Sequence, residues 1–98
     1  MADYTLFAGE TNRQLRFTVT DPGGVPLTNP GSATVTWRAS DGRERGLTLI
    51  DAASSVFAYT VSGGDYPGTR LETGQVRVSV GTSGWWLSAF TLRVLPHL

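Results

Sequence analysis

The sequence predicts an all-β domain, a sandwich of about seven or eight short antiparallel strands, with a small barrel as the alternative. Apolar and polar residues alternate over many short segments, most clearly in 15–19 and 33–37. Gly, Pro, Asn and Asp separate these segments, and none of them keeps a helical period. The 98 residues suit one domain, 1–98, without linker or internal repeat.

Each predicted strand has an apolar residue at every second position, the pattern of a strand with one buried and one wet face. In chain order the strands are residues 4–7, 13–20, 33–39, 46–51, 56–62, 75–80 and 85–95. The side chains expected to point inward are Leu15, Phe17, Val19, Ala33, Val35, Trp37, Phe57, Tyr59, Val61, Val76, Val78 and Val80. In segment 46–51, Leu47 and Leu49 point one way and their neighbours the other.

Turn-forming residues connect these strands. Residues 21–24, Asp-Pro-Gly-Gly, predict a tight turn, because Pro fixes φ at the second position and Gly accepts the positive φ that follows. Residues 25–28 are expected to be extended at a sheet edge, since Pro26 cannot donate to a ladder. Residues 62–74 form the longest irregular region. Residues 81–84 predict a hairpin loop that pairs the last strand antiparallel with its predecessor.

Composition excludes several classes of function. Eight acidic and eight basic residues, all of the latter Arg, give a net charge of zero, so nothing attracts nucleic acid or an anionic membrane over long range. The absence of Cys excludes disulfides and thiolate zinc sites. No segment approaches the ~20 apolar residues that span a bilayer. Residues 1–4 lack the basic and apolar regions of a signal peptide, so synthesis in a cytoplasm is expected.

The residue types that often act in catalysis do not form a recognisable active-site pattern in this sequence. The one histidine, His97, lies beside the C-terminus, where nothing holds it as the base of a triad. The carboxylates are scattered singly, without the pair that glycoside hydrolysis needs. The glycine pairs lack both the spacing and the following helix of a phosphate site. We therefore expect no enzyme activity, no cofactor and no metal.

The pair Trp85-Trp86 leaves three interpretations open. Adjacent strand residues point to opposite faces, and Trp86 shares its parity with Phe90, so Trp86 is expected inward and Trp85 outward beside Leu87. A bulge or the loop 63–73 would then bury Trp85. Alternatively, Trp85 and Leu87 form an exposed patch for a protein partner, or Trp85 beside Tyr66 stacks on a carbohydrate.

The C-terminal residues 95–98 are more apolar than a free tail needs to be. They either dock on a neighbouring subunit or pack against their own domain. The candidate partner-binding residues are Trp85, Leu87, Tyr66, Leu95 and Leu98.

Several segments together resemble a known group of domains. They are residues 15–19, Asp21, 23–24, 26–28, 33–37, 41–42, 59–62, 66–68, 75–78 and Val94. On these residues, which span most of 13–94, the chain resembles the Ig-like domain at the N-terminus of siphophage baseplate upper proteins. Related Ig-like modules occur in phage tail and capsid proteins.

The resemblance implies an Ig-like antiparallel β-sandwich and a non-enzymatic structural role in a bacteriophage virion. Such a module docks on, or decorates, a tail, baseplate or capsid assembly. Its expected partners are other virion subunits, with self-association as a further expectation, and neither nucleic acid nor membrane insertion is expected. Its location would be the virion, after synthesis in the host cytoplasm. The alternative is a carbohydrate-binding adhesion module that recognises a host-surface glycan.

Overall fold

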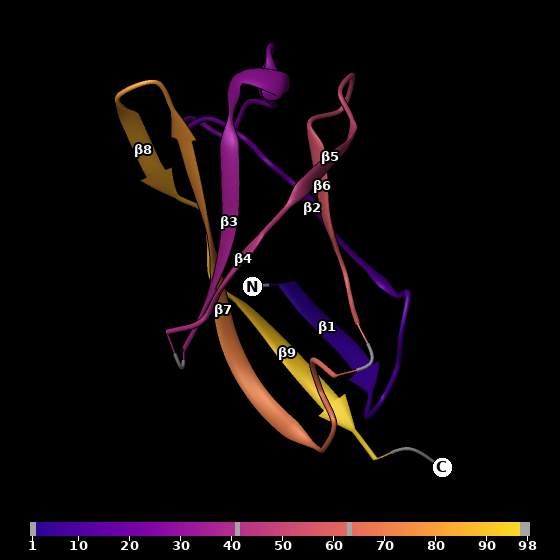
Figure 1. Ribbon diagram of the computed structural model, residues 1–98. Helices are drawn as coiled ribbons and strands as arrows, with labels where there is room; N and C mark the ends of the chain where they lie inside the picture. The colour runs from indigo at the N-terminus through magenta and orange to yellow at the C-terminus, as the bar shows by residue number, and fades with distance from the viewer. Residues whose placement is uncertain (1, 41, 63, 97–98) are drawn as a thin grey trace.

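A computed structural model describes residues 2–40, 42–62 and 64–96 and places them in two β-sheets (Figure 1). The elements are β1 (Ala2–Phe7), β2 (Gln14–Thr18), a 3₁₀ turn η1 (Pro30–Ser32), β3 (Thr34–Ala39), β4 (Glu44–Gly46), β5 (Thr48–Asp51), β6 (Val56–Thr60), β7 (Arg70–Val80), β8 (Ser83–Trp86) and β9 (Phe90–Leu95). The six-stranded sheet has the order β1-β9-β7-β3-β4, with β8 beside β7, and the three-stranded sheet has the order β2-β6-β5.

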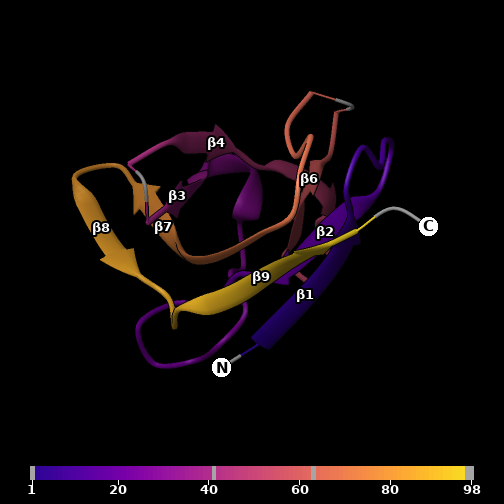
Figure 2. The same ribbon diagram turned by 90° about the horizontal axis from the view of Figure 1, so that it is seen from below.

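The two sheets share one core, which confirms the predicted sandwich. Among the described residues no strand pairing closes the two sheets into a barrel. The order β2-β6-β5 against β9-β7-β3-β4 is that of an immunoglobulin-type sandwich. Figure 2 shows β1 and β9 side by side at one edge of the larger sheet.

Two details differ from the predicted antiparallel strands. β1 runs parallel to β9, a pairing that alternation along the chain does not reveal. The described residues also hold nine strands, because segments 46–51 and 85–95 are not continuous strands. β4 pairs with β3 whereas β5 pairs with β6, so the chain changes sheets at Leu47. Residues 87–89 interrupt the other segment between β8 and β9.

The strand β7 begins earlier than the sequence predicts. Residues 62–74 were expected to be irregular, but β7 starts at Arg70 and pairs with β9 from there. The inward positions at this end of β7 are Glu72 and Gly74, both buried. Because neither is an apolar side chain, the alternation that marks a strand is hidden in this part of the sequence.

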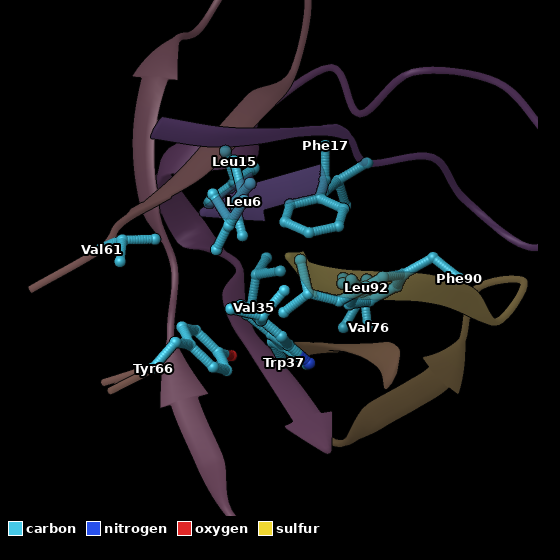
Figure 3. Close-up of a cluster of buried hydrophobic side chains, with 14 residues drawn as sticks. Leu6, Leu15, Phe17, Val35, Trp37, Val61, Tyr66, Val76, Phe90 and Leu92 are labelled. Atoms are coloured by element: carbon cyan, nitrogen blue, oxygen red, sulfur yellow. The ribbon is translucent and has the colours of Figure 1, made fainter. Parts of the chain in front are cut away.

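The core lies between the sheets and is rich in aromatic rings (Figure 3). Its buried members are Leu6, Leu15, Phe17, Val19, Val35, Trp37, Phe57, Val61, Tyr66, Val76, Val78, Phe90, Leu92 and Val94. The predicted inward residues Ala33, Tyr59 and Val80 are partly buried and pack against this cluster. The centroids of the Phe17 and Phe90 rings are 5.0 Å apart, and those of Trp37 and Phe90 are 5.2 Å apart.

The predicted turn at 21–24 is confirmed. Gly24 has a φ of +88°, and the carboxylate of Asp21 accepts hydrogen bonds from two backbone N–H groups of the turn. The chain beyond the turn is held by an antiparallel bridge between Thr20 and Pro26. The Asp21 carboxylate therefore satisfies the N–H groups of Gly23 and Val25, and this holds the turn in place.

Side chains block two exposed strand edges. The hydroxyl of Tyr4 donates to the carbonyl oxygen of Arg16 on the edge strand β2, at 2.8 Å. Glu10 accepts from the N–H of Phe7 through its carboxylate, at 3.2 Å, and donates its own N–H to the carbonyl oxygen of Phe7, at 3.0 Å. Free edge groups are templates for strand pairing between chains. These bonds leave less of the β1 and β2 edges open to such pairing.

Gly74 allows two buried core rings, Trp37 and Phe90, to meet. A Cβ atom at this position would lie 2.4 Å from Nε1 of Trp37 and 2.5 Å from Cζ of Phe90. Trp37 and Phe90 are 0% and 2% exposed, so neither ring can move into solvent. Any side chain at position 74 would therefore push two buried rings apart.

We expect Gly74→Ala to lower the free energy of unfolding by about 1–3 kcal/mol, the usual cost of overpacking a core. Urea denaturation of both proteins measures the difference. Gly46→Ala is the matched control, because Gly46 also lies in a strand but a Cβ there meets nothing within 4 Å. Equal midpoints for wild type and Gly74→Ala would contradict the tight contact.

Candidate functional site

The outer face of the six-stranded sheet carries three large exposed apolar side chains at one end. Phe7 of β1 lies opposite Leu95 of β9, and Leu71 of β7 lies opposite Arg93, two residues before Leu95 on the same face. Phe7 is 43% exposed, Leu95 is 40% exposed and Leu71 is 69% exposed. We call Phe7, Leu71 and Leu95 the apolar corner. Directly opposite and diagonal residues of paired strands lie within reach of one another, so the three form one patch.

The other end of the same face carries an aromatic and basic pair. Trp86 of β8 lies opposite Arg77 of β7, and the guanidinium carbon of Arg77 is 5.3 Å from the centroid of the Trp86 ring. A Cβ on Gly84 would meet Nη2 of Arg77 at 2.7 Å, so the missing side chain leaves room for the guanidinium. This cation–π contact holds an indole that is 41% exposed.

A hollow of about 400 Å³ lies beside Trp86. Its lining consists of Arg38, Ala39, Ser40, Thr73, Gly74, Gln75, Trp86 and Ala89. Two other surface hollows, of about 300 Å³ and about 290 Å³, are lined mainly by core-facing or loop residues. The hollow beside Trp86 combines an exposed aromatic ring with a charged side chain, and it opens on the same face as the apolar corner.

A second cluster, centred on Arg45, is structural. Its guanidinium carbon lies 5.2, 5.5 and 5.3 Å from the ring centroids of Trp37, Tyr59 and Tyr66. The hydroxyl of Tyr59 donates to Asp65, which also accepts the N–H of Ser62 at 2.8 Å. Trp37 and Tyr66 are fully buried and Arg45 fills the space between the rings. The cluster therefore ties the loop before β7 to the core and offers no ring face to a ligand.

Electrostatics in this cluster follow from burial and hydrogen bonding. Burial alone would raise the pKa of the Asp65 carboxyl, but hydrogen bonds from Tyr59 and the Ser62 N–H, with the charge of Arg45, lower it below its ordinary value. Burial, and the hydrogen bond to Asp65, raise the pKa of the Tyr59 hydroxyl. Both shifts favour the bonded pair of a neutral phenol and an ionised carboxylate.

Tyr66 is not available to a partner. It was a candidate partner-binding residue, but its side chain is 2% exposed and its hydroxyl donates to Oε1 of Glu72 at 3.0 Å. The buried Glu72 carboxylate also pairs with Nε of Arg70 at 3.2 Å. The Tyr66 side chain points inward from an otherwise largely exposed loop, and this hydrogen bond satisfies both buried polar groups.

The two adjacent tryptophans lie opposite to the prediction. Trp85 is partly buried against the core, and its Nε1–H donates to the carbonyl oxygen of Thr20 at 2.9 Å. Trp86, expected inward, is the exposed one. The parity argument fails because residues 87–89 are not in a strand and break the period between β8 and β9. Leu87 is likewise partly buried against the core.

Of the two candidate residues in the C-terminal tail, Leu95 lies among the described residues. Leu95 is 40% exposed, and the structure brings it together with Phe7 and Leu71, which the sequence did not single out. Leu98 lies outside the described residues. No local signal could have found the apolar corner, because its three members come from strands far apart in the chain.

The remaining findings concern metal ligands, membrane-spanning helices and known proteins. Among the described residues no group of three or more His, Cys, Asp or Glu side chains is placed to hold a metal ion. No helix of that part of the chain is long and apolar enough to cross a membrane. No family model matches the chain, and no curated protein matches it either.

The tyrosines provide a pH test of this packing. Burial raises the pKa of Tyr4, Tyr59 and Tyr66, most strongly that of Tyr66, from an ordinary value of 10.0. A phenol whose pKa is raised by folding adds stability that is complete below pH 10 and is lost as the pH rises further. In an alkaline titration, absorbance at 295 nm should therefore rise only as the far-ultraviolet circular dichroism of the sheets is lost. Ionisation of all three tyrosines near pH 10 with the sheets intact would contradict the burial of their hydroxyl groups.

Proposed function

We propose that the chain is a non-enzymatic interaction module of a bacteriophage virion that docks on a tail, baseplate or capsid subunit through the outer face of its six-stranded sheet. The apolar corner is the observation that carries this proposal. Phe7, Leu71 and Leu95 are contributed by three neighbouring strands and are all at least 40% exposed. Grouped exposed apolar side chains on a small protein typically mark an interaction site.

The surroundings of the apolar corner suit a protein partner. Thr5 and Arg93, which lie opposite each other beside it, are both exposed and polar. Interfaces commonly have an apolar centre that carries most of the binding energy and a polar rim that excludes water. Arg93 makes no ion pair with any residue that the structure describes. It is therefore available to hydrogen-bond a carboxylate or carbonyl group of the partner.

The blocked edges favour docking by side chains over strand addition. Glu10 occupies both backbone groups of Phe7, and Tyr4 occupies the carbonyl oxygen of Arg16. A partner strand added to β1 would first have to displace Glu10. The sheet face requires no such rearrangement, so its binding energy is not reduced by broken hydrogen bonds.

The virion assignment has separate support. The segments that resemble phage Ig-like modules span most of 13–94, and the net charge of zero suits a subunit that packs among others without long-range steering. The absence of an arranged catalytic set in the sequence agrees with a structural role. A host-surface glycan as the main ligand is the alternative, and its strongest feature is the exposed Trp86.

We expect Leu71→Ser to reduce incorporation of the chain into particles by about tenfold or more, the effect of losing roughly 1.4 kcal/mol at an interface. The test supplies wild-type or variant chain to cells infected with the encoding phage from which the gene is deleted. The copies of the chain per purified particle are then measured by quantitative mass spectrometry.

Val25→Ser is the matched control. Val25 is 57% exposed but lies on the loop after β2, away from the apolar corner, so its loss should leave the copy number unchanged. Both variants should keep the circular dichroism spectrum of the wild type, since neither side chain is buried. Full incorporation of Leu71→Ser, or equal losses for both variants, would refute docking through this face.

A further inference from the structure

The hollow beside Trp86 arises from a gap in strand pairing. β7 runs the length of the larger sheet, with β8 beside one half and β9 beside the other (Figure 1). Pairing with β8 ends at Arg77 opposite Trp86, and pairing with β9 starts at Gly74 opposite Phe90. Residues 87–89 between these points belong to no strand, although the N–H of Leu87 still donates to the carbonyl oxygen of Val76 at 2.9 Å. The resulting hollow of about 400 Å³ is within the size range of small-ligand sites.

One wall of the hollow is a braced aromatic ring. Trp86 lines the hollow, whereas Arg77, which packs against the same indole, does not. Arg77 thus supports the indole from outside the hollow, and the rest of the exposed ring remains uncovered. An aromatic side chain held in place before binding loses little conformational entropy when a ligand packs on it.

The other walls offer polar groups, of which the Gln75 amide is held by a hydrogen bond. Arg38 lines the hollow, and no ion pair joins it to Glu44, which lies opposite in the register, or to any other described residue. Nε2 of Gln75 donates to the carbonyl oxygen of Leu87 at 3.1 Å, which orients the amide and leaves its Oε1 as an acceptor. Ser40 and Thr73 add hydroxyl groups, and no carboxylate is among the lining residues that the structure describes.

These groups together select a class of ligand. The C–H face of a pyranose packs on an indole, because its weakly positive hydrogens meet the negative face of the ring. Its hydroxyls match the hydroxyl and amide groups of the opposite wall. Arg38 provides a planar donor pair for a carboxylate, and none of the described lining residues is acidic.

Other ligands fit the hollow less well. An extended peptide is recognised through free backbone groups, but β3 and β7 pair with each other beside the hollow, from Arg38 opposite Gln75 to Ala39 opposite Gly74. A nucleic acid strand requires several cations along its phosphates, and Arg38 is the one charged residue among the described residues of the lining. We propose that the hollow binds a hexuronic acid, stacked on Trp86 with its carboxylate on Arg38.

This site goes beyond the proposed docking function and uses none of the residues of the apolar corner. The test is a ¹H–¹⁵N NMR titration of the whole chain with methyl glucuronide, and with methyl glucoside and acetate as separate probes. Each probe is added to about 10 mM, which is ten times a Kd in the millimolar range. Methyl glucuronide should shift the indole N–H of Trp86 and the amides of residues 73–75. The other two probes should bind at least about tenfold more weakly.

Variants assign the two contacts. Trp86→Ala should weaken glucuronide binding by about tenfold or more, and Arg38→Gln should remove the preference for glucuronide over glucoside. Leu71→Ser, the docking variant, should bind glucuronide as the wild type does, which separates failure of this site from failure of docking.

Three results would overturn the assignment. The first is that neither sugar shifts the resonances of the hollow. The second is that acetate alone shifts them as much as methyl glucuronide does. The third is that a folded Trp86→Ala variant binds glucuronide as tightly as the wild type. Equal affinity for glucoside and glucuronide would overturn the acidic ligand. Tighter binding of an oligothymidylate added as a fourth probe would identify the hollow as a nucleic-acid site instead.

Discussion

The close packing of Trp37 and Phe90 against the bare backbone of Gly74 is the contact on which the sandwich depends. It joins β3, β7 and β9 at the centre of the larger sheet, and Phe17 of the opposite sheet packs on both rings. The buried Nε1 of Trp37 has no hydrogen-bond partner among the described residues. Such a group costs about 1–3 kcal/mol, so the ring contacts must more than offset that loss.

The same strands that form this core also determine the outer face. Because side chains alternate along a strand, fixing Glu72 and Gly74 inward fixes Leu71 outward, and fixing Leu92 inward places Arg93 outward. The parallel pairing of β1 then brings Phe7 beside Leu95. The pairing register of the strands therefore determines both the core and the candidate interface. A shift of one residue in that register would move the core side chains outward and the exposed ones inward.

Sequence alternation was sufficient for the sandwich and for most inward residues, and the residues Asp-Pro-Gly-Gly were sufficient for the turn at 21–24. Each of these predictions depends on neighbours within a few positions. Alternation was insufficient where the strand period is hidden or broken. Glu72 and Gly74 concealed the start of β7, and residues 87–89 reversed the expected sides of Trp85 and Trp86. The apolar corner and the hollow depend on which strands become neighbours, which a period-two pattern does not specify.

A cryo-electron microscopy reconstruction of the proposed phage particle tests the central claim most directly. The account predicts that the outer face of β1, β9 and β7 is covered by a neighbouring subunit, with Phe7, Leu71 and Leu95 at the centre of the contact. The outer face of the β2-β6-β5 sheet would then lie outside that contact. A particle in which the β1-β9-β7 face is open to solvent, or one that lacks the chain altogether, would contradict the account.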